Sequence, residues 1–176
     1  SKTIDDFKNF IKGDRDKNIF NLSNDIHSFI HLVDGSARKY NIKFILELDD
    51  DIKIDGYENE LIQCFINIFN NAKDVLKEIN EDSRYIFITT FIDDKSNAVI
   101  KIKDNAGGIP IEIIEKIFEP YFTTKHQSQG TGLGLNMTYN LIVDGMNGII
   151  EANNENYSYL DTKYSGAVFT ITLPMG

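Results

Sequence analysis

The long amphipathic segment at residues 58–79 constrains the fold of this chain more than any other feature. Its apolar residues recur at intervals of three and four, which predicts a long helix with one buried face. The residues of this stripe are Leu61, Phe65, Ile68, Ala72, Val75 and Ile79. A helix with such a face needs a matching apolar surface, which the rest of the chain has to supply.

Strand patterns on both sides of this helix supply that surface. Upstream, residues 42–48 and 52–55 flank the polar turn Asp49–Asp51 and look like a hairpin. Before them comes a strand at 18–22 and then a helix to about Tyr40. Its apolar face holds Ile26, Ile30 and Val33, and we expect Ser23 or Asn24 to cap its N-terminus. Downstream we expect strands at 84–92, 98–103, 148–152 and 167–173, and helices at 111–118 and 132–143.

The order of these elements indicates the fold class. Strands fall in local pairs and helices lie between the pairs, which favours an α+β two-layer sandwich over a doubly wound parallel sheet. The 18 Lys and Arg against 27 Asp and Glu leave a net charge of −9, which disfavours general nucleic-acid binding and anionic membrane surfaces. The single cysteine, Cys64, excludes an internal disulfide and a cysteine-rich zinc site, and it lies near the apolar face of the long helix. No apolar stretch approaches the roughly 18 residues of a membrane helix, so we expect an intracellular protein.

Two glycine-containing segments are candidates for ligand binding. Asp104–Ile109 directly follows a strand, where a carboxylate can accept a hydrogen bond from an exocyclic amine such as that of adenine. Gly130–Leu135 leads into a helix, where backbone N–H groups and the helix N-terminus suit a phosphate. The second segment matches neither a Rossmann fingerprint nor a Walker A loop. Taken singly, Gly130–Leu135 is equally well explained as a flexible turn, and for Asp104–Ile109 a plain Asp/Asn/Gly turn is the commoner explanation.

The long helix carries a third candidate. Asn67 and Asn71 are four residues apart and share one helical face. Asparagine is a poor residue for a helix interior, and its amide oxygen is a suitable ligand for Mg²⁺. The alternative is that these amides simply face water.

Taken together, these segments resemble the catalytic ATP-binding domain of bacterial sensor histidine kinases. Residues 67–72 resemble that family's N box, 104–109 its first glycine box, 117–125 its F box and 130–135 its second glycine box. The four motifs stand in the family's order, and the likeness covers about residues 18–174. The resemblance implies the Bergerat ATP-binding fold, a mixed and mostly antiparallel sheet with helices on one face, and it implies ATP and Mg²⁺ as cofactors.

The resemblance also implies roles for individual residues. Asn71 would ligate Mg²⁺, Asp104 would read adenine, and Lys125 on the lid would reach the terminal phosphate. Gly108 would line the base pocket, and Thr170 in the last strand would support the adenine. Ala106 replaces the usual first glycine of its box. The remaining residues expected at the nucleotide are Ile109, Gly130, Thr131, Gly132, Leu133 and Gly134.

Asn67 separates two kinds of reaction within this fold. The related gyrase, chaperone and mismatch-repair ATPases carry a glutamate at this position, where it activates water. A neutral amide cannot act as a general base, so Asn67 argues for phosphoryl transfer to a histidine over hydrolysis. An ATPase of the same fold that drives conformational change, or a non-catalytic nucleotide-binding module, remains the alternative.

The acceptor histidine is not expected within this chain. The family places it on a dimerising helical hairpin, before an acidic residue, and none of His27, His31 and His126 has that context. We therefore expect residues 1–16 to be the end of the dimerisation and phosphoacceptor helix with its linker, and 17–176 to be the catalytic domain. The expected partners are ATP, the kinase's own phosphoacceptor domain and a response regulator receiver domain, without nucleic acid. We expect the fragment to be monomeric and cytoplasmic. We expect the parent protein to be a homodimer, and an anchor in the inner membrane is compatible with this expectation.

Overall fold

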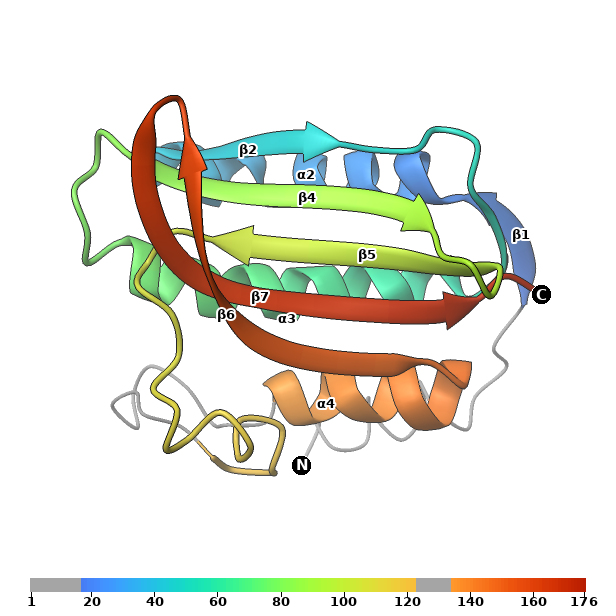
Figure 1. Ribbon diagram of the computed structural model, residues 1–176. Helices are drawn as coiled ribbons and strands as arrows, with labels where there is room; N and C mark the ends of the chain where they lie inside the picture. The colour runs from blue at the N-terminus through green and yellow to red at the C-terminus, as the bar shows by residue number, and fades with distance from the viewer. Residues whose placement is uncertain (1–16, 123–133) are drawn as a thin grey trace.

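The computed structural model describes residues 17–122 and 134–176, which form a two-layer α+β sandwich. One layer is a five-stranded sheet, and helices α2, α3 and α4 all lie against one face of it (Figure 1). This arrangement confirms the predicted fold class. The predictions for residues 1–16, both the helix and the domain boundary, lie outside the described residues.

The main sheet has the strand order β2-β4-β5-β7-β6. β2 runs parallel to β4, and every other pair of neighbours is antiparallel. The strands are β2 (Ile42–Glu47), β4 (Arg84–Ile92), β5 (Asn97–Asp104), β7 (Thr162–Pro174) and β6 (Ile149–Tyr159). β6 and β7 extend well beyond their predicted bounds and form a long hairpin that arches at one end of the sheet (Figure 1).

The predicted hairpin of residues 42–48 and 52–55 is wrong. β3 (Lys53–Gly56) leaves the main sheet and pairs antiparallel with β1 (Asn18–Asn21) as a separate two-stranded sheet. The turn between β2 and β3 is held instead by the start of α2: Asn21 Nδ2 donates to the Asp50 carbonyl at 2.8 Å. β2 finds its partner in β4 across the α3 crossover, the connection that a parallel pair requires.

Helix α2 (Leu22–Lys39) begins earlier than its sequence signals predicted. Its N-cap is Asn21, whose side-chain oxygen accepts from the Asn24 N–H at 2.9 Å. The predicted caps were therefore wrong, since Ser23 and Asn24 already lie in the first turn. Asn21 is also the last residue of β1, so the strand passes directly into the helix.

Helix α3 (Glu58–Leu76) carries the predicted apolar stripe with one change of register at its end. Leu61, Phe65 and Ile68 are buried, as predicted, but Val75 is 47% exposed and Leu76 is fully buried. Leu76 follows Ala72 by four residues and stays on the core side, while Val75 falls outside the stripe. Four aromatic rings pack between α2, α3 and the sheet: Phe29, Phe44, Phe65 and Phe69.

The predicted helix at 111–118 is absent. The segment is a series of separate turns. The N–H of Ile113 donates to the Pro110 carbonyl, and the N–H of Lys116 donates to the Ile113 carbonyl. Two other helical stretches follow in the described part of the chain. α4 (Gly134–Asn140) continues into a π-helical turn, η1 (Leu141–Gly145).

Candidate functional site

Asp104 ends β5 on the side of the sheet that faces the helices. Only 6% of the residue is exposed. Its Oδ1 accepts the N–H of Ala106 at 3.0 Å and the N–H of Ala167 at 3.2 Å. Burial raises the pKa of this carboxyl, and the two backbone N–H donors oppose that rise.

The two oxygens of the Asp104 carboxylate have different surroundings. Within the described part of the chain, Oδ2 accepts no hydrogen bond, and the backbone donors hold Oδ1 in place. A carboxylate oxygen in this setting can accept one N–H from a flat ligand. An exocyclic amine such as that of adenine provides such a donor.

The loop after Asp104 is fixed from both ends. Gly107 and Gly108 both have positive φ angles, of 95° and 91°, and the Gly107 N–H donates to the Ser165 carbonyl at 2.9 Å. The buried Asn105 side chain accepts from Tyr85 N–H and donates to the Ser83 carbonyl, at 3.0 and 2.7 Å. Ala106 packs against the core, so the alanine in the glycine box is accommodated by contact with apolar neighbours.

Sequence reasoning missed two residues that hold this loop in place, Asn154 and Gly166. Asn154 of β6 holds both polar groups of Ile109: Oδ1 accepts its N–H and Nδ2 donates to its carbonyl, each at 2.7 Å. A Cβ on Gly108 would lie 2.7 Å from Asn154 Oδ1, the atom that accepts the Ile109 N–H, and the positive φ of Gly108 also favours glycine there. A Cβ on Gly166 of β7 would overlap the Asp104 carbonyl oxygen. A glycine inside a strand is a known signal of close backbone approach, and Gly166 carries that signal.

The two asparagines of α3 have different surroundings. Asn67 Nδ2 donates to the Gly134 carbonyl at 3.2 Å and to Thr138 Oγ1 at 3.1 Å, and Asn67 Oδ1 accepts from Gln63 at 3.1 Å. Asn67 thereby ties α3 to the first turn of α4. Asn71 Nδ2 donates to the Asn67 carbonyl at 2.9 Å, one turn back on the same helix.

Thr170 does not lie with Asp104. Side chains alternate along a strand, and Ala167, Phe169 and Ile171 of β7 belong to the core beneath the helices. Thr170 therefore projects from the opposite face of the sheet, where it stands between Lys101 and Glu151. The residue of β7 that contacts the Asp104 carboxylate is Ala167.

Several predicted site residues lie outside the described residues: Lys125, Gly130, Thr131, Gly132 and Leu133. Gly134 is described and begins α4.

Both helix histidines, His27 and His31, are exposed, and no group of three or more potential metal ligands occurs within residues 17–122 and 134–176. Across the same ranges, no helix is long and apolar enough to cross a membrane. Cys64 is buried in the core, as predicted.

Comparisons with known proteins match this geometry. The family model described as histidine kinase-, DNA gyrase B-, and HSP90-like ATPase matches residues 56–176. Sporulation kinase E of Bacillus subtilis is 35% identical over 147 residues, which are 83% of this chain but only 18% of that protein. The chain thus spans less than a fifth of the length of this relative.

Solved structures give the same result. The nucleotide-free catalytic domain of histidine kinase ThkA superposes with a TM-score of 0.74 at 30% identity, covering 91% of this chain and 96% of that one. A structure of ThkA in complex with response regulator protein TrrA has a TM-score of 0.70 at 24% identity, covering 99% of this chain and 48% of that one.

Proposed function

The chain belongs to the family of histidine kinase-, DNA gyrase B- and HSP90-like ATPases, as a catalytic ATP-binding domain of the histidine kinase type, and from this premise we propose how it acts. The domain binds Mg·ATP and transfers the γ-phosphoryl group to a histidine on a helical hairpin domain outside this chain. The phosphoryl group then passes to the receiver domain of a response regulator. The complex of ThkA with a response regulator supports this last step.

The observation that carries the proposal is the state of Asp104. Its carboxylate is buried at a strand end, one oxygen is held by two backbone N–H groups, and the other accepts no hydrogen bond within the described residues. We assign Oδ2 as the acceptor for the exocyclic amine of adenine. Ala106, Gly108 and Ile109 are the proposed walls of the base pocket.

Mg²⁺ fits the donors that this chain offers. Mg²⁺ in kinases is held by one or two protein oxygens together with substrate phosphates, and not by an all-protein cage. We propose that the Asn71 amide oxygen is a protein ligand, while the metal, when bound, neutralises phosphate charge.

Asn67 supports transfer to histidine over hydrolysis. Its amide is neutral and is bound to α4 and to Gln63, so it cannot take a proton from water. In this proposal Asn67 contributes by placing the first turn of α4, which contains the last two residues of the second glycine box, Gly134 and Leu135. Lys125 and residues 130–134 are the proposed phosphate contacts. A steady-state hydrolysis assay separates this function from that of a conformational ATPase, which would turn over ATP without an acceptor.

The binding step is tested by Asp104→Asn. The substitution replaces a charged acceptor by an amide and removes a hydrogen bond worth about 1.5–3 kcal/mol, so the dissociation constant for ADP should rise by roughly 10- to 150-fold. Calorimetric titration with ADP and GDP measures this loss. Asp94→Asn is the matched control, because Asp94 is exposed in the turn at the other end of β5. Unchanged ADP affinity in Asp104→Asn would remove Asp104 from the site.

The transfer step is tested with labelled Mg·ATP. The chain alone should acquire no phosphate on histidine, while a matching helical hairpin domain added in trans should become labelled through an acid-labile bond. Strong self-labelling of His27, His31 or His126 would place the acceptor within this chain and overturn the proposed division of labour.

A further inference from the structure

The far half of the β6–β7 hairpin arches over the face of the sheet that is turned away from the helices (Figure 1), and the hairpin hydrogen-bonds to the loop that follows Asp104. We propose that Tyr157 of this hairpin is a positioning residue for Asp104 and thereby sets the affinity for the adenine base. The inference deepens the proposed function, since it rests on Asp104 reading adenine.

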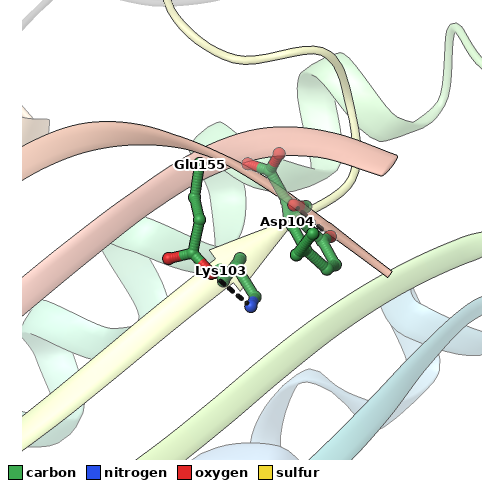
Figure 2. A network of polar contacts seen from close by, with 4 residues as sticks. Lys103, Asp104 and Glu155 are labelled. Carbon is green, nitrogen blue, oxygen red and sulfur yellow. Dashed lines mark hydrogen bonds and ion pairs between the residues drawn. The ribbon is translucent and has the colours of Figure 1, made fainter. Parts of the chain in front are cut away.

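The Tyr157 hydroxyl donates to the main-chain carbonyl of Asp104 at 2.7 Å. The neighbouring residue on β5, Lys103, places its Nζ 3.8 Å from the centre of the Tyr157 ring. The same Nζ forms an ion pair with Glu155 Oε1 at 3.0 Å, and Figure 2 shows Lys103 turned toward Glu155 beside Asp104. Tyr157 is therefore held by its ring as well as by its hydroxyl.

An aromatic cluster fixes the Tyr157 ring further. It contacts Phe87 of β4 edge-on, with ring centres 5.4 Å apart, and Tyr164 across the hairpin at 6.1 Å. The full cluster consists of Tyr85, Phe87, Tyr157, Tyr159 and Tyr164. Burial and the Asp104 carboxylate raise the pKa of the Tyr157 hydroxyl, so it stays protonated and donates at physiological pH.

These contacts clamp Asp104 from two directions. Its carboxylate is held by the Ala106 and Ala167 N–H groups, and its carbonyl is held by Tyr157. Fixing both ends of one residue fixes the direction of Oδ2, the oxygen proposed to meet adenine. The same hairpin also holds the rest of the loop by hydrogen bonds. The Gly107 N–H donates to the Ser165 carbonyl, and the Asn154 side chain bonds both the N–H and the carbonyl of Ile109.

The test compares two tyrosine-to-phenylalanine variants of neighbouring residues on β6. Tyr157→Phe keeps the ring and removes the hydroxyl that bonds Asp104, so the dissociation constant for ADP should rise by about 3- to 10-fold, the loss of one hydrogen bond. Tyr159→Phe is the control: its ring lies in the same cluster, and its hydroxyl makes no hydrogen bond with a described residue. Its ADP affinity should stay within twofold of the wild type.

A second ligand separates positioning from general damage to the loop. Purine riboside 5′-diphosphate lacks the exocyclic amine, so Tyr157→Phe and the wild type should bind it equally. In an Asp104→Asn background, Tyr157→Phe should have no further effect on ADP binding, because the positioned group is already lost.

The outcomes distinguish the two proposals. If the wild type does not bind ADP, or Asp104→Asn binds it unchanged, the proposed function fails. If Asp104→Asn loses ADP but Tyr157→Phe matches Tyr159→Phe, the positioning role alone is refuted. An equal loss of both ligands in Tyr157→Phe also refutes it, and would assign the hydroxyl to the stability of the loop.

Discussion

Replacing Asp25 by asparagine should stabilise this domain at neutral pH. Asp25 lies in the first turn of α2 and is 4% exposed, and its Oδ2 is buried without a hydrogen-bond partner among the described residues. Burial, helped by the nearby charge of Glu58, raises its pKa from 3.8 to about 8. The folded domain therefore holds a proton that the unfolded chain releases.

The size and sign of the effect follow from this difference in proton binding. Between about pH 4 and pH 8 the folded state binds more protons than the unfolded state, so the free energy of unfolding falls as the pH rises. The slope for one proton is about 1.4 kcal/mol per pH unit, which sets a ceiling of about 4 kcal/mol at pH 7. Below about pH 4 both states are protonated and the contribution disappears. Asparagine cannot ionise, so Asp25→Asn removes this pH-dependent loss.

The assay is urea unfolding of both proteins across this pH range. Any fixed cost of the buried asparagine amide is independent of pH, so the diagnostic quantity is the difference between the two curves. The advantage of Asp25→Asn should grow from pH 4 to pH 8 and then level off. Asp34→Asn, on the same helix, is the control, because Asp34 is half exposed and ion-paired with Arg38. Parallel curves for Asp25→Asn and the wild type would refute the reasoning.

Three further predictions concern the site and its frame. Gly166→Ala should destabilise the domain by about 1–3 kcal/mol and weaken ADP binding, because the new Cβ overlaps the Asp104 carbonyl; unchanged melting and titration would contradict this. Arg84→Lys should lower the melting temperature by about 4–8 °C, since a lysine cannot replace the guanidinium bonds to carbonyls at the ends of α2 and α3, and an unaltered melting curve would count against it. Asn71→Ala should weaken Mg²⁺-dependent ATP binding by on the order of tenfold while leaving binding in EDTA unchanged, which titration with and without metal measures.

The elements that sequence reasoning predicted well are those whose pattern is long and local. α3, β4 and β5 have clear periodicity, and each was predicted within a few residues of its bounds. The end of α3 was misplaced because the stripe continues in the sequence to Ile79. The Arg84 guanidinium binds the carbonyls of Lys77 and Ile79 just beyond the helix, and no local pattern reveals this contact.

The errors occur where a distant partner decides the structure. Residues 42–48 and 52–55 are close in sequence and both have strand-like sequences, yet their partners are β4 and β1. The far half of the β6–β7 hairpin was missed because residues 153–159 are mostly polar. Its strand character comes from the cross-strand register and from tyrosines that pack on Phe87, a residue about 70 positions away.

The same distinction applies to the residues around Asp104. Asp104 was predicted because a carboxylate at a strand end before two glycines is a local pattern. The register of β5 with β7 places Val168 opposite Lys103, and so sets Ala167 beside Asp104. Thr170 lies three residues further along, an odd number, which puts its side chain on the opposite face of the sheet. A motif can thus single out the residue that we propose meets the ligand, but the pairing of distant strands determines which backbone N–H, glycine and tyrosine hold that residue in position.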